Sequence, residues 1–140
     1  MKNLLFISTL LFSLFSFAQS KEHVGVYKLD LGSESHFEKT TLTLNSDGTF
    51  LFHFYDYREN GIPKERTKYG KGTWTSEGKL ILFSGNEKDV DDAHVLNFNN
   101  SKARFDTKSP RDKSDRIIPT SIRFYKSDIF WMVGRTMVKE

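Results

Sequence analysis

The sequence predicts an all-β protein, an antiparallel meander of about eight or nine short strands that closes into a small barrel. Three observations support this prediction. Apolar and polar residues alternate with a period of two through residues 24–138, no segment shows the period of a helix, and short turn sequences separate the alternating segments. A chain of hairpins without a crossover helix forms an antiparallel sheet, and closing the sheet removes its two exposed edges. A β-sandwich is the alternative architecture.

The strands are expected at the alternating segments, joined in chain order by hairpins. Their ranges are 24–31, 37–45, 49–57, 67–75, 79–84, 94–98, 102–107, 117–125 and 128–138. The longer connections are 58–66, 85–93 and 108–116. The length of 140 residues is that of one ordinary domain, and no change in composition marks a boundary inside it.

Two turn sequences, 45–49 and 75–79, are near copies of each other, with glycine in the fourth position. A three-residue loop that ends in glycine suits a type I turn followed by a left-handed residue, because glycine has no Cβ to clash there. The pairs that such loops set opposite each other are Leu44 with Phe50 and Trp74 with Leu80.

This register gathers apolar side chains on one face of each hairpin, because residues two apart in a strand share a face. In chain order, the four faces carry Leu42, Leu44, Phe50, Phe52 and Phe54; then Trp74, Leu80 and Leu82; then Leu96, Phe98, Ala103 and Phe105; and last Ile122, Phe124, Ile129, Trp131 and Val133. The opposite face of each strand is mixed.

Residues 1–18 have the three parts of a secretory signal peptide. A short basic start at 1–3 precedes an apolar run at 4–17, and Ser16-Phe17-Ala18 places small residues where a signal peptidase reads them. The run of about 14 residues is shorter than the ~20 that a membrane-spanning helix needs. We expect cleavage after Ala18, and a single domain of residues 19–140 in the periplasm of a bacterium or outside the cell, without a membrane span.

The composition excludes several functional classes. The chain has no cysteine, so disulfides, thiolate metal sites, cysteine nucleophiles and lipidated cysteines are ruled out. Without Lys2, 20 basic residues stand against 18 acidic ones, and a net charge of +2 is too small to indicate a nucleic-acid partner. The chain has no nucleophile elbow, phosphate-binding loop or His-Glu metal motif, so we expect no enzyme activity and no cofactor.

Three motifs follow one another in the first half of the mature chain. They are Gly25-x-Tyr27-x-Leu29, Leu42-Thr-Leu44-Asn-x-Asp-Gly-Thr-Phe50 and Gly72-Thr-Trp74-x-x-x-Gly-Lys-Leu80-x-Leu82. Their order resembles the small lipocalin-like domains of bacterial exported proteins and, more distantly, the barrel of the copper-stress lipoproteins. The resemblance covers residues 24–83 and implies an up-and-down barrel of about eight strands with a cavity for a small apolar ligand. The chain lacks the paired and anchoring cysteines of the copper-stress group.

The inward-facing aromatic residues are the candidate ligand-binding residues. A barrel of about eight strands is just wide enough to be filled by side chains or to hold one small ligand, so these rings either line a cavity or fill it. The candidates are Tyr27, Phe50, Phe52, Phe54, Trp74 and Trp131.

Two functions follow from these alternatives. With a cavity, the protein is an exported barrel that binds a small apolar ligand. With a filled interior, it is a non-enzymatic module that binds another protein of the cell envelope, because loops on a rigid scaffold commonly carry binding residues. The working surface expected for that module consists of Tyr55, Tyr57, Arg123 and Tyr125.

The histidines and one acidic loop are the remaining candidates for chemistry. No two of the four histidines have the local spacing of a metal site, and His53 alternates with Leu51 and Tyr55 on the mixed face of its strand. The loop from Glu87 to His94 is rich in carboxylates but lacks the ligand spacing of a calcium loop. We expect no metal site, and leave open whether this loop holds an ion.

Overall fold

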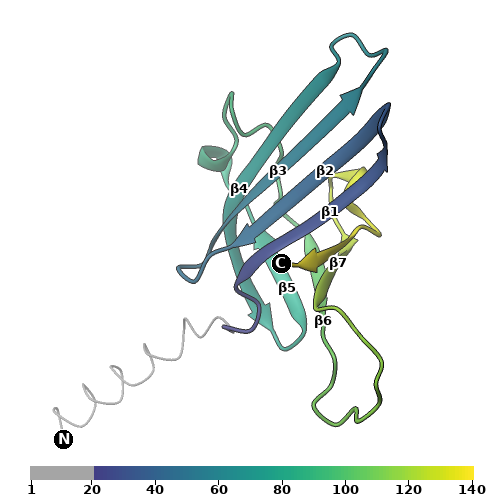
Figure 1. Ribbon diagram of the computed structural model, residues 1–140. Helices are drawn as coiled ribbons and strands as arrows, with labels where there is room; N and C mark the ends of the chain where they lie inside the picture. The colour runs from purple at the N-terminus through teal and green to yellow at the C-terminus, as the bar shows by residue number, and fades with distance from the viewer. Residues whose placement is uncertain (1–20) are drawn as a thin grey trace, which may run out of the picture.

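Eight antiparallel strands close into a barrel in simple chain order, β1 to β8 (Figure 1). The structure is a computed structural model that describes residues 21–140, so the predicted signal peptide lies outside the described residues. The strands are β1 (Gly25–Ser33), β2 (His36–Leu44), β3 (Thr49–Arg58), β4 (Glu65–Glu77), β5 (Leu80–Ser84), β6 (Lys102–Asp106), β7 (Ser121–Lys126) and β8 (Thr136–Lys139). The predicted all-β meander is confirmed, and the sandwich alternative is wrong.

The first and last strands close the barrel through a short pairing. Tyr27 and Lys28 of β1 pair with Lys139 and Val138 of β8. Beyond β8, the backbone N–H of Glu140 donates to the carbonyl of Val26 at 2.8 Å. The pairing therefore lies at the extreme C-terminus of the chain, and it leaves the second half of β1 without a neighbour on that side.

The predicted register of the first hairpin is confirmed. Leu44 lies opposite Phe50, and the loop between β2 and β3 has three residues that end in Gly48 with a φ of +87°. One carboxylate oxygen of Asp47 accepts hydrogen bonds from the hydroxyl and the backbone N–H of Thr49, and these bonds lower the pKa of Asp47. Local side-chain chemistry therefore supports the left-handed glycine of this turn.

The predicted register of the second hairpin is wrong. Glu77 pairs with Leu80, so the loop has two residues, and Gly78 takes the positive φ that such a loop requires at its first position. A loop shorter by one residue reverses the two faces of β5. Ile81 and Phe83 are therefore buried in the interior, whereas the expected Leu80 is 37% exposed and lies outside.

The expected strand at 94–98 does not form. Only Leu96 makes an isolated bridge, to Gly70 of β4, within a long connection between β5 and β6 that also contains the 3-10 helix η1 (Glu87–Asp89). Leu96 and Phe98 nevertheless reach the interior, as the sequence predicts. Gly70 makes room for them, because a Cβ there would lie 2.5 Å from the ring of Phe98.

The expected strand at 128–138 is only half present. A second 3-10 helix, η2 (Phe130–Met132), interrupts the alternation, so Met132 is fully buried and Val133 is 49% exposed instead of facing inward. Only the last part of the segment pairs, as β8, where Met137 reaches the interior. The short helix leaves Trp131 partly buried beside the core.

Aromatic side chains fill the middle of the barrel. Phe98 lies among rings from three strands, with ring centroids 4.8 Å from Phe52 of β3, 6.2 Å from Phe83 of β5 and 6.3 Å from Phe124 of β7. The indole N–H of Trp74 donates to the carbonyl of Asn45 at 3.0 Å. The other fully buried side chains of the core include Tyr27, Leu42, Leu44, Ile81, Phe105, Ile122 and Met132. The interior is therefore packed with side chains.

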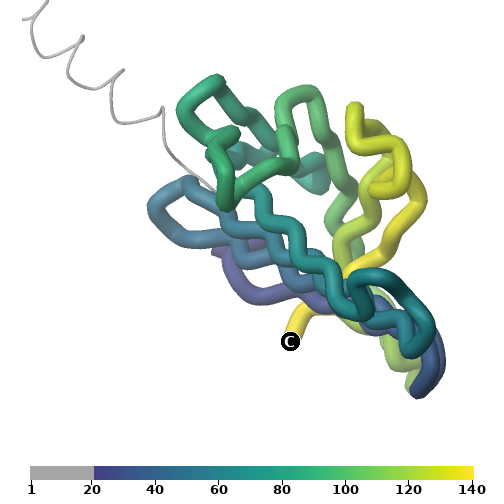
Figure 2. Tube along the Cα trace, turned by 90° about the horizontal axis from the view of Figure 1, so that it is seen from above, coloured from purple at the N-terminus to yellow at the C-terminus, as the bar shows by residue number. Residues whose placement is uncertain are grey.

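The first four strands are longer than the last four and extend past the core at one end (Figures 1 and 2). β5 pairs with β4 only over Thr73–Glu77, and β8 leaves β1 after Lys28, so the far halves of β1 to β4 continue as a four-stranded sheet. The tips of its two hairpins touch, since the N–H of Glu59 donates to the carbonyl of Ser35 at 2.8 Å. We call this part of the molecule the open end.

His23 closes the opposite end of the barrel. Its ring is 1% exposed and packs edge-on against Phe105, with centroids 4.4 Å apart, while its carbonyl accepts the hydroxyl of Tyr27 at 2.7 Å. Burial lowers the pKa of His23, Glu22 nearby opposes this shift, and Lys139 adds to it.

Within residues 21–140, no helix has the length and apolarity needed to cross a membrane.

The burial of His23 predicts a loss of stability in mild acid. The folded chain resists protonation of this ring, whereas the unfolded chain takes up a proton near the ordinary pKa of 6.5, so the free energy of unfolding should fall as the pH drops below that value. The slope due to one proton is at most about 1.4 kcal/mol per pH unit. Urea unfolding between about pH 8 and pH 5 measures it.

The control for this prediction is His23→Phe, which keeps a ring in the same place but cannot be protonated. The variant should lose less stability than the original chain over the same pH range. Equal pH dependence of the two proteins would show that other groups, and not His23, set the response to acid.

Candidate functional site at the open end of the barrel

The six predicted ligand-binding residues divide into two groups. Four of them, Tyr27, Phe50, Phe52 and Trp74, are at most 2% exposed and belong to the packed core. Phe54 and Trp131 are partly buried beside the core, with ring centroids 4.9 Å apart. Because a ligand can reach only rings that are not already covered by protein, the structure leaves this pair as the apolar part of a candidate site.

Above Phe54, the inner face of the sheet changes from apolar to charged. The alternation that puts Phe52 and Phe54 inside continues to Asp56 and Arg58 on β3. The residues that share this face on the neighbouring strands are Thr40, Glu38 and His36 on β2, and Lys68 and Arg66 on β4. We call the charged residues among these (His36, Glu38, Asp56, Arg58, Arg66 and Lys68) the polar wall.

Arg135 connects the polar wall to the aromatic pair. Its Nη2 donates to Glu38 Oε2 at 2.9 Å, and its Nε donates to the carbonyl of Trp131 at 3.0 Å. The guanidinium lies 5.1 Å from the ring centroid of Trp131 and 5.9 Å from that of Phe54, close enough to attract both rings. Because the ion pair with Glu38 is largely shielded from water, it holds Arg135 in one orientation.

Two hydrogen-bonding groups beside the aromatic pair have no partner among the described residues. They are Nη1 of Arg135 and the hydroxyl of Thr40, and both atoms are buried. Thr40 lies directly opposite Phe54 and two residues from Glu38 on the same face of β2. A buried polar group without a hydrogen bond costs about 1–3 kcal/mol, so two of them in one place require an explanation.

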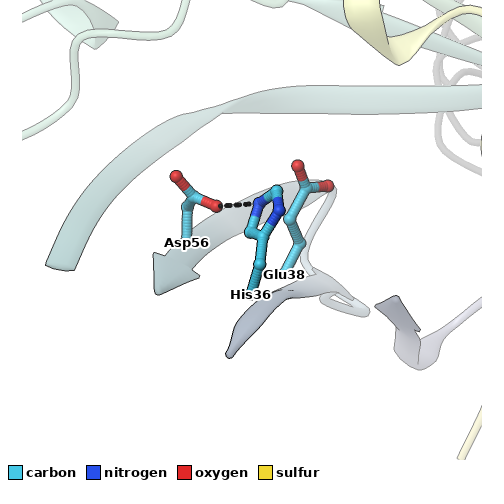
Figure 3. A group of neighbouring side chains, drawn as sticks. All are labelled: His36, Glu38 and Asp56. Atoms are coloured by element: carbon cyan, nitrogen blue, oxygen red, sulfur yellow. Dashed lines mark hydrogen bonds and ion pairs between the residues drawn. The ribbon is translucent and has the colours of Figure 1, made fainter. Parts of the chain in front are cut away.

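Figure 3 shows a cluster in the polar wall whose ligand atoms lie within 4.8 Å of one another: His36, Glu38 and Asp56. His36 Nε2 lies 3.1 Å from Asp56 Oδ1, and Arg58 Nε donates to the other oxygen at 3.1 Å. Arg58 and Arg135 thus neutralise the two carboxylates and repel a divalent cation. The imidazole and the two carboxylates are groups that can bind a metal ion, but the neighbouring arginines disfavour a bound cation.

The polar wall and Arg135 carry more positive than negative charge. Arg58 and Arg135 offset Asp56 and Glu38. Arg66 and Lys68 are exposed, and neither makes an ion pair with any described residue. The open end therefore presents a net positive inner face above an apolar floor. Along the inner face of β3, three phenylalanines are followed by Asp56 and Arg58. This change from apolar to charged residues on one face is the feature of the sequence from which the site could have been predicted.

The candidate histidine, His53, and the acidic loop lie on the outside of the barrel. His53 stacks on Tyr69, with centroids 4.5 Å apart, and so faces away from the interior. Asp91 accepts hydrogen bonds from the ring and the backbone of His94 and from Lys71, and these bonds lower its pKa. Among residues 21–140, only the cluster in Figure 3 brings three potential metal ligands together, so the carboxylates of the acidic loop do not converge.

The surface predicted for a protein partner is not continuous. Tyr55 and Tyr57 lie on β3, whereas Arg123 and Tyr125 lie on β7, and these two strands occupy opposite walls of the eight-stranded ring. The predicted four-residue surface is therefore wrong. The tyrosines of β3 instead form an aromatic group with Phe37, whose ring stacks 5.1 Å from that of Tyr57.

The unpartnered hydroxyl of Thr40 makes a prediction about stability. Thr40→Val keeps the shape of the side chain but removes the buried hydroxyl, so it should raise the free energy of unfolding by about 1–2 kcal/mol. Thr41→Val, on the outer face of the same strand, is the matched control and should change stability by less than about 0.5 kcal/mol. Urea unfolding compares the three proteins. A loss of stability in Thr40→Val would mean that the hydroxyl has a partner in the folded chain.

Comparisons with protein-family models, with curated proteins and with solved structures find no match to this chain. The eight-stranded closed barrel is compatible with a lipocalin-like architecture. Membership of that family stays a prediction from the three motifs in residues 24–83.

Proposed function

We propose that this chain is an exported, lipocalin-like barrel that binds a small apolar molecule at its open end. The observation that carries the proposal is the division of the predicted ligand-binding rings. Four of these rings are buried in the core: Tyr27, Phe50, Phe52 and Trp74. The other two, Phe54 and Trp131, are only partly buried and lie at the mouth of the barrel, where the open end begins. The binding position is therefore the mouth, above a filled interior.

The surroundings of the aromatic pair support this position. Leu29 and Ile129 are also partly buried and pack against the core, and Leu29 pairs with Thr40, the cross-strand neighbour of Phe54. A shallow, open hollow runs along the tip of the β1–β2 hairpin and reaches the polar wall at Glu38. Phe54 and Trp131 do not line this hollow, so the apolar part of the proposed site consists of the aromatic pair itself.

Export is the second part of the proposal, and residues 1–18 support it by their basic, apolar and small-residue segments. When the full chain is expressed in a bacterium and recovered from the envelope or the medium, its intact mass should be that of residues 19–140. Recovery only in the cytoplasm, with residues 1–18 still attached, would contradict export. This result is independent of ligand binding.

Binding at the mouth predicts different effects for two neighbouring residues. Trp131→Ala removes half of the aromatic pair and should weaken binding of the neutral fluorescent probe N-phenyl-1-naphthylamine by about tenfold or more. Phe130→Ala is the matched control, because Phe130 is 86% exposed on the same 3-10 helix. It should change the affinity by less than about twofold. Fluorescence titration measures both variants.

Two results of this titration would reject the proposal. One is the absence of probe binding by the original chain. The other is an equal loss in both variants, which would place the probe on the outer surface of the helix.

The second candidate function is a non-enzymatic module that binds a protein of the cell envelope. The filled interior favours it, and so does the aromatic group of Phe37, Tyr55 and Tyr57 on the outer face of the open end. If the original chain binds no probe, Tyr57→Ala becomes the variant to compare in crosslinking experiments with envelope extract. A partner that is captured by the original chain and lost with this variant would support the module.

A further inference from the structure

We propose that the molecule bound at the open end is an amphiphile with an anionic head, a carboxylate or a phosphate ester, which Arg135 and Thr40 bind by hydrogen bonds. This inference rests on the proposed function and adds the chemistry of the ligand to it. Three features carry it: the two unpartnered donors, their position beside the aromatic pair, and the charge of the polar wall.

The donors require an acceptor. Arg135 uses Nε and Nη2 for the carbonyl of Trp131 and for Glu38, which leaves both N–H bonds of Nη1 without a partner. Thr40 has a hydroxyl without a partner. An arginine cannot accept a hydrogen bond, so only a group with acceptor atoms satisfies it, and an anionic acceptor does so more strongly than a neutral one.

The position of the donors fixes the arrangement of head and tail. The guanidinium of Arg135 lies beside the rings of Trp131 and Phe54, and Thr40 is the cross-strand neighbour of Phe54. A head that bonds to Nη1 therefore brings its tail against these rings. Polar recognition and apolar contact occur at one place, as an amphiphile requires.

The charge of the surroundings selects an anion. Arg66 and Lys68 face the same side of the sheet and have no ion pair with any described residue, whereas both carboxylates of the polar wall already have an arginine partner. A cationic head would meet this excess of positive charge, and a metal ion would meet the same repulsion. The potential of the open end thus favours an incoming anion.

Nη1 and the Thr40 hydroxyl are shielded from water, so a ligand reaches them only when a neighbouring side chain moves, and the ring of Trp131 lies 5.1 Å from the guanidinium. Trp131 lies in the 3-10 helix η2, and Ile129, the N-cap residue before this helix, makes no side-chain capping bond. The other tryptophan, Trp74, is held in the core by its bond to the carbonyl of Asn45. A change in tryptophan emission on ligand binding is therefore expected from Trp131 and should vanish in Trp131→Phe.

The test compares heads on a constant tail. Dodecanoate, dodecyl phosphate, dodecanol and dodecylammonium compete with N-phenyl-1-naphthylamine on the full mature chain, each below its micelle concentration. The two anions should bind at least about tenfold more tightly than the alcohol, and the ammonium more weakly than the alcohol. Acetate and inorganic phosphate, which lack a tail, should not displace the probe.

Each other outcome has a defined meaning. Equal affinity for the alcohol and the anions overturns the anionic head but leaves the apolar site intact. Tightest binding of the ammonium assigns the head to the carboxylates of Figure 3 and also overturns it. Displacement by acetate or inorganic phosphate alone overturns the amphiphile. No binding of the probe or of any dodecyl compound rejects the proposed function itself.

Three variants assign the anion preference to the named groups. Arg135→Gln, made together with Glu38→Gln so that no buried charge is left unpaired, should bring the anions and the alcohol to similar affinity. Thr40→Val should reduce the preference in part. Arg123→Gln, on the exposed face of β7, should leave it unchanged.

Glu38→Gln alone provides a variant that should gain affinity. The amide oxygen of Gln can still accept the hydrogen bond from Arg135 Nη2, but the negative charge is gone, so the anions should bind about threefold more tightly or better. The alcohol should bind as before. A purely structural role of the Arg135–Glu38 pair would weaken all four compounds alike, and that result, or an unchanged preference in both Thr40→Val and the double variant, would overturn the inference.

Discussion

The packing of Phe98 in the centre of the barrel is the contact on which the rest of the structure depends. Its ring meets aromatic side chains of β3, β5 and β7, although Phe98 belongs to a connection and not to a strand. The contact is possible because Gly70 carries no side chain at the point where Phe98 passes. In an interior that is filled in this way, the aromatic rings contact one another and not a ligand. A ligand can therefore bind only at an end of the barrel.

The two ends of the barrel are built differently. At one end, the ring of His23 packs on the core and covers its end, and burial lowers the pKa of this ring. At the other end, β1 to β4 extend beyond the shorter strands β5 to β8. The inner face of the sheet is charged from the point where it passes the core. Arg135 connects the apolar core to the charged inner face, because it contacts the rings of Phe54 and Trp131 and forms an ion pair with Glu38.

The buried donors at the open end cost stability that the fold does not need. A valine in place of Thr40 would fill the same space without an unsatisfied hydroxyl. Functional sites commonly retain such groups, because a polar atom that hydrogen-bonds to a ligand has no partner when the ligand is absent. These two atoms lie beside the partly buried aromatic pair, and this is why the open end, and not the outer surface, carries our proposal.

The sequence by itself determined the class of the fold, the order of the hairpins and most of the inward-facing residues. These features depend on two-residue alternation and on local turn chemistry, such as the Asp47–Thr49 bonds before the left-handed Gly48. The same information did not decide the second hairpin, because a two-residue and a three-residue loop both fit its glycine. In the folded chain, the two-residue loop places Ile81 and Phe83 in the interior and leaves Leu80 outside.

Only the tertiary structure decided the site. Arg135 and Glu38 are 97 residues apart, and they meet because closure of the barrel brings the end of the chain to β2. Strand parity predicts that Phe54, Asp56 and Arg58 share a face, but not that this face extends past the core. Whether an aromatic ring is covered depends on what packs on it from elsewhere in the chain, so sequence alone could not separate Phe54 and Trp131 from the rings of the core.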